Sequence, residues 1–283
     1  MEVKSIAVVG AGTMGRGIAY AALAGGFRTL LTDVGEDILA KARAYIVETL
    51  EGAQARGKWQ GDVEKTLGGL TLTAKLEDAA SADLIIEAVP EEMWLKLETF
   101  GRLEKAARAE TIFASNTSSL SLTEMSAATA RPQRFLGMHF FNPVPKMKLI
   151  ELVYTPQTSE ETLRAAEEVG RRMGKETVRV KDSPGFATSR INALIGNEAF
   201  RMLEEGVASA EDIDKAVMLG LNHPMGPFEM VDLVGLDVRL AILEYLHKTL
   251  GERFQPSARM VELVKAGRLG RKTGRGVYGY TKS

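Results

Sequence analysis

The sequence predicts an α/β domain built on a doubly wound, mostly parallel sheet, followed by an all-α domain. Through the first two thirds of the chain, short apolar or β-branched runs alternate with longer helical patterns. Several of these runs are apolar at nearly every position, as strands buried on both faces of a parallel sheet are. After a Ser-Pro-Gly cluster at 183–185 only helical patterns remain. We therefore expect two domains, 1–183 and 184–283.

The predicted elements follow in chain order. Strands are expected at 4–10, 27–33, 70–73, 83–89, 111–116, 134–141, 147–154 and 176–182. Helices are expected between most of them, at 13–25, 36–58, 92–109, 120–128 and 159–173. Repeated strand, helix, strand units place helices on both faces of one sheet. The second domain is expected to hold helices at 186–205, 210–219, 227–250 with an interruption near Gly235, and 258–266.

The composition excludes several classes of function. Charged residues make up 26% of the chain and the formal net charge is -1, so no overall field attracts nucleic acid or an anionic membrane. No apolar run approaches the ~18–20 residues that span a bilayer, and the N-terminus enters a strand pattern without the features of a signal peptide. We expect a cytoplasmic protein. The absence of cysteine excludes disulfides and thiolate catalysis, and no metal site is expected.

A glycine-rich stretch, "VVGAGTMGRGIA", joins the first predicted strand to the first helix. In the GxGxxG pattern, the first glycine permits a tight turn, the second lets a pyrophosphate approach the backbone, and the third allows helix and strand to pack closely. The same spacing can be a simple strand-to-helix turn. Because it lies between the first strand and helix, it predicts a dinucleotide cofactor held by Gly10, Gly12, Thr13, Met14 and Gly15.

An aspartate at the end of the second predicted strand points to the type of dinucleotide. Asp33 lies eighteen residues after Gly15, where a carboxylate accepts hydrogen bonds from the adenosine ribose and repels a 2′-phosphate. The next residue is Val34, so no adjacent arginine is available for that phosphate. The alternative is a helix-capping or solvated turn residue. The pattern predicts NAD as the cofactor.

A dehydrogenase that oxidises an alcohol needs a base for the hydroxyl proton, and histidine suits this task near neutral pH. The chain has three histidines. His247 lies in an amphipathic helical pattern, and His223 precedes a proline. His139 lies at the carboxyl end of a predicted strand, where ligands of open α/β sheets bind. By itself such a histidine is more often a packed residue.

Glu151 changes the interpretation of His139. It is the single charge in the apolar run "LIELVY", and a buried charge requires a partner. If 134–141 and 147–154 form an antiparallel hairpin around Pro145, His139 and Glu151 lie opposite one another. A carboxylate there would hold one ring nitrogen and raise the basicity of the other.

Two polar side chains follow strands at the same edge. Ser118 lies in "SNTSSL", after the strand at 111–116, and Asn142 lies three positions beyond His139. Either could donate a hydrogen bond to a substrate oxygen. Hydroxyl and amide side chains in such loops also cap turns, and the two interpretations are equally open.

Together these stretches resemble a known family. "VVGAGTMGRGIA", "IIEAVPEEMWLKLETF", "FASNTSSL", "MHFFNPVPKMKLIELV", "KDSPGF" and "HPMGPFEMVDLVGLD" occur in this order and are similar to the 3-hydroxyacyl-CoA dehydrogenases, especially the short 3-hydroxybutyryl-CoA type. The resemblance covers nearly the whole chain. It implies NAD-dependent oxidation of a (3S)-3-hydroxyacyl-CoA to the 3-ketoacyl-CoA and the reverse, as in fatty-acid oxidation and butanoate metabolism.

The resemblance also implies roles for individual residues. His139 is expected as general acid and base, with Glu151 as its orienting partner. Ser118 and Asn142 are expected to contact the substrate or the nicotinamide. The remaining implied contacts with the nicotinamide half of NAD are Glu91 and Lys96. The helical domain is expected to close over the site and to form a homodimer.

Three positions depart from the family pattern. Ser189 stands in "PGFATSRIN" where the family normally carries an asparagine that contacts the substrate. Thr49 and Arg56 stand where the family has a serine and a lysine that contact CoA, and both keep the chemistry. The alternative for Arg56, a solvated helix residue, is equally open. A serine cannot donate and accept as a carboxamide does, so the acyl range is the property most exposed to change.

Two other functions are compatible with the sequence. One is an NAD-dependent dehydrogenase of a hydroxy acid or sugar acid without CoA, because such enzymes resemble this family. The other is a dinucleotide-binding protein without catalysis. The presence of both His139 and Glu151 favours an enzyme.

Overall fold

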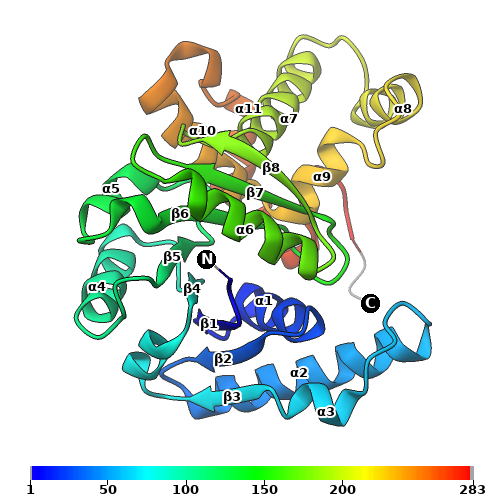
Figure 1. Ribbon diagram of the computed structural model, residues 1–283. Coiled ribbons are helices and arrows are strands. Elements are labelled where there is room, and N and C mark those ends of the chain that lie inside the picture. Colours follow the sequence, from blue (N-terminus) through cyan, green and yellow to red (C-terminus); the bar gives the residue numbers. More distant parts are fainter. Residues whose placement is uncertain (1, 281–283) are drawn as a thin grey trace. The chain divides into compact units, whose positions relative to one another are not determined.

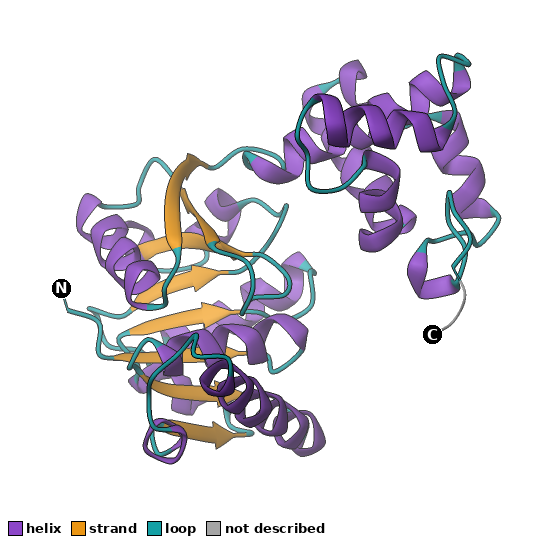
Figure 2. Ribbon diagram, turned by 90° about the vertical axis from the view of Figure 1, so that its right-hand side faces the viewer, coloured by secondary structure: helices purple, strands orange, loops and turns teal. Residues whose placement is uncertain are grey.

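The computed structural model describes residues 2–280. Contacts between residues divide the chain into two compact units, Met1–Asp182 and Ser183–Ser283. The first unit is a sheet covered by helices, and the second is helical (Figure 1; Figure 2). No helix within 2–280 is long and apolar enough to cross a membrane.

The first unit contains an eight-stranded sheet with the spatial order β3-β2-β1-β4-β5-β6-β7-β8. Its strands are β1 (Ser5–Val9), β2 (Arg28–Thr32), β3 (Leu70–Thr73), β4 (Leu84–Glu87), β5 (Ile112–Ser115), β6 (Phe135–Phe140), β7 (Leu149–Tyr154) and β8 (Glu176–Lys181). Of the described strand pairs, β6 and β7 are antiparallel and the others are parallel. The strand order reverses direction between β1 and β4, which is where ligands of open α/β sheets bind.

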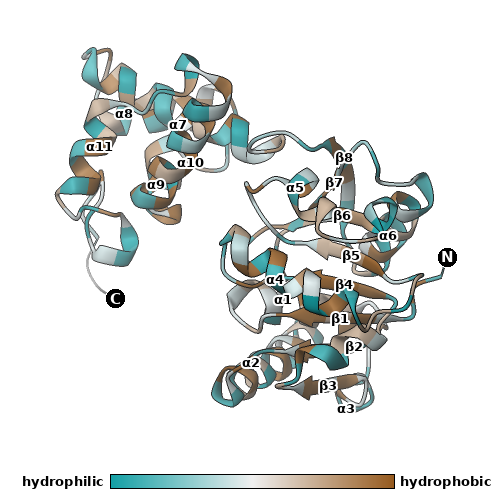
Figure 3. Ribbon diagram, turned by 90° about the vertical axis from the view of Figure 1, so that its left-hand side faces the viewer, coloured by the Kyte–Doolittle hydropathy of each residue, from teal (hydrophilic) through white to brown (hydrophobic). Residues whose placement is uncertain are grey.

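Helices cover both faces of this sheet. They are α1 (Thr13–Ala24), α2 (Glu36–Ala55), α3 (Val63–Leu67), α4 (Met93–Glu104), α5 (Leu122–Ala127) and α6 (Glu160–Arg172), with 3-10 turns η1 (Leu76–Ser81) and η2 (Pro132–Arg134). On one face, side chains of α1, α2 and α6 share a core with alternate residues of the strands, among them Ile6 and Val8. On the other face, Phe100 of α4 packs against Phe113 and Phe135. Figure 3 shows the apolar character of the central strands β1 and β4.

The second unit has its own apolar core. It consists of α7 (Thr188–Glu204), α8 (Ala210–Gly220), α9 (Pro227–Val234), α10 (Leu236–Leu250) and α11 (Ala258–Lys265), with 3-10 turns η3 (Glu252–Phe254) and η4 (Arg271–Thr273). Phe200, Phe228 and Phe254 are fully buried within it. Gly235, with a φ of 109°, separates α9 from α10, which confirms the predicted interruption.

The predicted fold class is therefore confirmed, and each expected strand and helix is present. Their ends lie within three residues of the predicted ones except in the helix expected at 92–109, which ends at Glu104, five residues early. The sequence patterns did not predict α3 or the 3-10 turns η1, η2, η3 and η4. All five elements are short, and α3 has no buried residue, so none carries an amphipathic pattern long enough to identify it.

Candidate active site

The glycine-rich turn joins β1 to α1 at the point where the strand order reverses. Gly10 has a φ of 97°, and a Cβ atom there would lie 2.6 Å from the carbonyl oxygen of Ala88, directly after β4. A Cβ atom on Gly15 would lie 1.7 Å from the carbonyl oxygen of Gly10. Both glycines are therefore required by the protein's own packing.

Gly12 is different, because a Cβ atom there would meet no protein atom within 4 Å. Gly12 is the N-terminal cap of α1, and its φ of -64° is one that any residue can adopt. No side chain forms a capping hydrogen bond at this end of the helix. Open space beside uncapped N–H groups is what a close-approaching pyrophosphate requires. Thr13 and Met14 begin α1 directly after this space. These residues fit the phosphate part of a dinucleotide.

Asp33 follows β2 beside the same turn. Its Oδ2 atom accepts a hydrogen bond from the backbone N–H of Ala11 at 2.7 Å, and Oδ1 accepts one from Gly35 at 3.2 Å. The carboxylate therefore supports the glycine-rich turn and lies at the carboxyl end of β2. The neighbouring Val34 is 94% exposed.

The predicted hairpin register is confirmed. In the antiparallel pair of β6 and β7, His139 lies opposite Glu151, and Nδ1 of His139 lies 2.7 Å from Oε2 of Glu151. The Glu151 side chain is fully buried and that of His139 is 8% exposed. An ionised carboxylate only accepts hydrogen bonds, so it places the ring proton on Nδ1 and leaves Nε2 as the basic nitrogen.

A side chain that the sequence analysis missed connects the neighbouring strand end to His139. Asn116 follows β5, and its Oδ1 atom accepts a hydrogen bond from the backbone N–H of Phe140 at 3.0 Å. The loop that carries Ser118 is thereby joined to the end of β6. Asn142 lies just beyond that end and is exposed. Ser118, Asn142 and His139 therefore occupy adjacent strand ends of one sheet.

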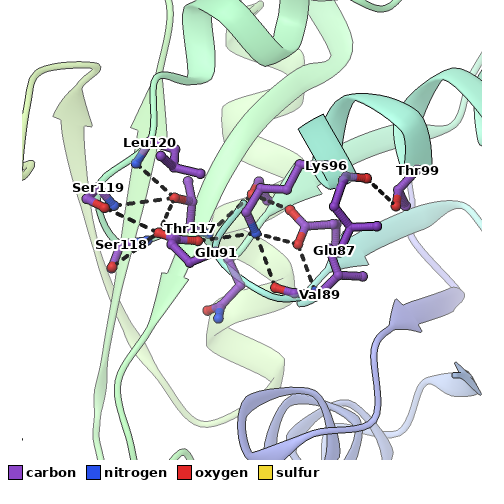
Figure 4. A network of polar contacts seen from close by, with 12 residues as sticks. Glu87, Val89, Glu91, Lys96, Thr99, Thr117, Ser118, Ser119 and Leu120 are labelled. Atoms are coloured by element: carbon purple, nitrogen blue, oxygen red, sulfur yellow. Dashed lines mark hydrogen bonds and ion pairs between the residues drawn. The ribbon is translucent and has the colours of Figure 1, made fainter. Parts of the chain in front are cut away.

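A buried ionic cluster lies at the ends of β4 and β5 (Figure 4). Lys96 of α4 donates from Nζ to Oε1 of Glu87 at 2.6 Å, and the same ammonium lies 3.3 Å from Oε2 of Glu91. The side chain of Lys96 is 1% exposed, that of Glu87 is fully buried, and that of Glu91 is 39% exposed. Glu91 is thus the member that reaches the surface of the chain.

Hydrogen bonds extend this cluster in two directions. Glu87 also accepts from the hydroxyl of Ser115 at 2.6 Å and from the N–H of Val89 at 2.8 Å. On the other side, Oε1 of Glu91 accepts from the hydroxyl of Thr117 at 2.6 Å and the N–H of Ser118 at 2.9 Å. The loop after β4 is therefore tied to the loop after β5.

The two carboxylates of this cluster have opposite pKa shifts. Burial is the largest influence on Glu87 and raises its pKa despite the neighbouring Lys96. Burial also acts to raise the pKa of Glu91, but Lys96 and the hydrogen bonds from Thr117 and Ser118 outweigh it and lower that pKa. Glu91 is therefore held as a carboxylate at neutral pH.

Glu87 was also missed in the sequence analysis. It is the one charge within the apolar strand β4, "LIIE", which is the same signal that singled out Glu151. Its partner Lys96 lies nine residues further on, in a helix on the other side of a loop. That pairing is a tertiary contact that no strand register predicts.

The remaining predicted site residues lie on other elements of the chain. Thr49 is on α2 and donates from its hydroxyl to the carbonyl of Tyr45 at 2.6 Å. Arg56 follows the end of α2 and is exposed. Ser189 is the second residue of α7, in the helical unit. The first turns of α7 also line an apolar pocket of about 330 Å³ within that unit, together with His223 and Met225. Within 2–280, no three His, Asp or Glu side chains are grouped as metal ligands are.

Comparisons with known proteins give a consistent identification. The NAD binding domain model of 3-hydroxyacyl-CoA dehydrogenase matches residues 5–183, and the model of its C-terminal domain matches 185–280. Hydroxyacyl-coenzyme A dehydrogenase, mitochondrial, from Sus scrofa is 46% identical over 98% of this chain and 91% of its own length. Probable 3-hydroxybutyryl-CoA dehydrogenase from Bacillus subtilis is 43% identical over 99% of this chain and 98% of its own.

A solved structure extends the similarity to the fold. The crystal structure of (S)-3-hydroxybutyryl-CoA dehydrogenase from Ralstonia eutropha is 41% identical, with a TM-score of 0.96, over 99% of this chain and 100% of that one. The family models together cover nearly all of the described residues, and the dinucleotide turn and the His139–Glu151 pair fall within the first of them. The chain belongs to the 3-hydroxyacyl-CoA dehydrogenase family and is an oxidoreductase.

Proposed function

We propose that this chain catalyses the NAD-dependent oxidation of a short (3S)-3-hydroxyacyl-CoA, 3-hydroxybutyryl-CoA in the first place, to the 3-ketoacyl-CoA, and the reverse reaction. The observation that carries the proposal is the buried His139–Glu151 pair, with Nδ1 and Oε2 2.7 Å apart, at the carboxyl edge of a sheet that also carries the dinucleotide turn. Relatives with these reactions in their names support the choice of substrate.

The cofactor is expected to bind along the edge formed by β1, β2 and β4. Gly12, Thr13 and Met14 are the residues for the pyrophosphate, and Asp33 for the hydroxyls of the adenosine ribose. Glu91 is the candidate for a contact with the nicotinamide half. Lys96 is a second candidate; it is almost fully enclosed and lies 3.3 Å from Glu91, so it also holds that carboxylate in place. Bound NAD supplies the hydride acceptor for the reaction.

His139 is the proposed general acid and base. In the oxidation, Nε2 accepts the proton of the C3 hydroxyl while C3 loses a hydride, and in the reduction the imidazolium returns that proton. The carboxylate of Glu151 fixes the tautomer and stabilises the imidazolium through Nδ1. Ser118 and Asn142, on adjacent strand ends, are the candidates for donating hydrogen bonds to the substrate oxygen.

We also propose that the helical unit contributes to substrate binding and to a homodimer. Within that unit, Ser189 on α7 is the candidate for a contact with the acyl group. In the first unit, Thr49 on α2 and Arg56 just after α2 are the candidates for contacts with CoA. Of twelve exposed large apolar side chains among the described residues, seven belong to the helical unit, Ile191, Val207, Leu219, Leu221, Leu233, Val234 and Val238. Exposed apolar side chains of this kind favour burial against a second copy. Light scattering would test this by measuring the molar mass in solution. The cytoplasmic location stays a prediction from the sequence.

One assay separates this function from its rivals. Purified protein is mixed with NADH and either acetoacetyl-CoA or acetoacetate, and absorbance at the NADH band is followed. We expect rapid oxidation with acetoacetyl-CoA only, and longer 3-ketoacyl-CoAs then define the chain-length range. A preference for acetoacetate would indicate a dehydrogenase of acids without CoA. Tight NADH binding without turnover would indicate a non-catalytic protein.

A further inference from the structure

The Glu87 side chain is too deeply enclosed to contact a ligand directly, and that of Lys96 is almost fully enclosed. The side chain of Glu87 is 0% exposed and that of Lys96 is 1% exposed. Each polar atom of the pair is used within the protein, since Nζ of Lys96 also lies 3.4 Å from the carbonyl oxygen of Val89. A buried ion pair of this kind is weak support for stability, because the cost of removing two charges from water offsets most of their attraction. Its presence here therefore requires an explanation beyond stability.

Glu91 provides that explanation, because it links the buried pair to the surface. Its Oε2 atom lies 3.3 Å from Nζ of Lys96, while Oε1 accepts hydrogen bonds from Thr117 and Ser118 in the loop after β5. Thr117 in turn accepts from the N–H of Leu120 at 3.0 Å. The position of Lys96 therefore fixes the position of the Glu91 carboxylate and of the backbone that carries Ser118 (Figure 4).

Lys96 is itself positioned by Glu87. The Glu87 carboxylate is anchored at the strand end by Ser115, its register partner on β5, and by the N–H of Val89. Strand ends are more rigid than loops, so the ends of β4 and β5 fix the position of the cluster, and the cluster fixes the loops that follow these strands. The ammonium thus lies between two carboxylates, 2.6 Å from Oε1 of Glu87 and 3.3 Å from Oε2 of Glu91.

We infer that Glu87 is a positioning residue for the reaction, which acts through Lys96 to hold the Glu91 carboxylate and the Ser118 loop at the cofactor edge of the sheet. The inference rests on the proposed function, because it gives Glu91 a contact with the nucleotide. It differs from a purely structural role in one respect: its effect on the nucleotide passes through Glu91.

Glu87→Gln is the variant that tests this inference. Glutamine has the shape of glutamate and can still accept from Val89, but it removes the charge that balances Lys96. Lys96 would then be drawn toward Glu91, its remaining carboxylate. The matched control is Glu104→Gln at the other end of α4, where Nε and Nη2 of Arg131 lie 3.0 Å and 2.9 Å from the Glu104 carboxylate. Both changes break an ion pair of the same helix, and only one lies in the cluster.

The experiment measures NADH binding by fluorescence titration, together with the thermal midpoint, in the wild type, in the two variants, in Glu91→Gln and in Glu87→Gln combined with Glu91→Gln. We expect Glu87→Gln to weaken NADH binding ~5–10-fold, as coupled contacts do, and Glu104→Gln to leave it within about twofold. In the Glu91→Gln background the Glu87 change should alter binding less than about twofold. The inference is overturned if Glu87→Gln binds NADH with the affinity of Glu104→Gln. It is also overturned if the loss of affinity in the double variant equals the product of the losses in Glu87→Gln and Glu91→Gln.

The pH dependence of NADH binding gives a second signature. Lys96→Met leaves the burial of Glu91 without its compensating cation, so its pKa rises, and binding should weaken at a higher pH than in the wild type. Glu87→Gln leaves the charge of Lys96 without its first partner, so the pH at which NADH binding weakens should fall or stay unchanged. A rise of this pH in both variants would contradict the proposed role of Lys96 between Glu87 and Glu91.

NADH binding requires no acyl substrate, so the two hypotheses fail separately. A wild-type chain that binds NADH but does not reduce acetoacetyl-CoA would contradict the proposed function, and the binding cycle would still decide the role of Glu87.

Discussion

Nδ1 of His139 lies 2.7 Å from Oε2 of Glu151, across the antiparallel pair of β6 and β7. The Glu151 side chain has no exposed surface and that of His139 has 8%. A carboxylate without a partner would be unstable in such a place, and the Glu151 carboxylate in turn favours the proton on Nδ1 of His139. The two residues therefore depend on one another, and the register of β6 and β7 holds them together.

Replacement of the carboxylate should separate its role from packing. We expect Glu151→Gln to lower kcat ~10²–10⁴-fold, because an amide can hold the wrong tautomer and cannot stabilise the imidazolium. NADH binding should change little. Glu167→Gln is a suitable control, since it breaks an exposed ion pair with Arg179 on β8, the other neighbour of β7. A kcat of Glu151→Gln equal to that of the control would refute the orienting role.

Asp33 has two tasks that substitution can separate. Asp33→Asn keeps an acceptor for the N–H of Ala11 but removes the charge that repels a 2′-phosphate. Asp33→Ala removes both. Both variants should lose most of the preference for NAD over NADP, and Asp33→Ala should also raise the KM for NAD ~10-fold or more, as loss of hydrogen bonds to a charged group does. The measurement is KM and kcat with each nucleotide; an unchanged preference in both variants would remove Asp33 from the ribose site.

Asp83 links the N-terminal strand to its neighbours and should make stability depend on acidic pH. Its carboxylate accepts from the N–H groups of Lys4 and Ser5 and from Arg108. Burial alone would raise its pKa, but these hydrogen bonds together lower it to about 2. A carboxylate whose pKa is lower in the folded state stabilises the fold at pH values above its unfolded-state pKa, which is near 3.9. This stabilisation is lost as the pH falls toward the folded-state pKa.

Allowing for solvent screening, the contribution of Asp83 is about 1 kcal/mol at neutral pH. Asp83→Asn should therefore lower the thermal midpoint by ~2–4 °C at pH 7, and about half of that difference should be gone at pH 3. Calorimetry at the two pH values measures it. A difference that stays constant with pH would show that Asp83 contributes through shape and not through charge.

Ser189 stands where the family pattern has asparagine, and it lies in the first turn of α7. Ser189→Asn would restore a side chain that can both donate and accept. We expect a KM for acetoacetyl-CoA lower by ~2–10-fold, the value of one net hydrogen bond, with the KM for NADH unchanged. Steady-state kinetics with ketoacyl-CoAs of increasing length would show whether the gain is confined to short chains. No change with any substrate would exclude Ser189 from the acyl site.

Local sequence patterns were sufficient to predict the strands of the sheet and the pairing of His139 with Glu151. The strands are continuous apolar runs, and His139 and Glu151 are equally distant from Pro145 in the chain, so an antiparallel hairpin brings them together in one register. Asn116 and Glu87 were missed because their partners, Phe140 and Lys96, are set by how loops pack and not by register. Glu87 did carry a signal, a single charge in an apolar strand, but only the structure identifies the cation that it holds.

The most direct test of catalysis by His139 is the turnover of His139→Gln. NADH oxidation by acetoacetyl-CoA is measured in the wild type and the variant, with NADH binding measured in parallel to show that the cofactor site is intact. If His139 is the general acid and base, kcat should be lower by ~10²–10⁴-fold, the usual contribution of such catalysis, with NADH binding unchanged. Near-normal turnover of His139→Gln would contradict that role.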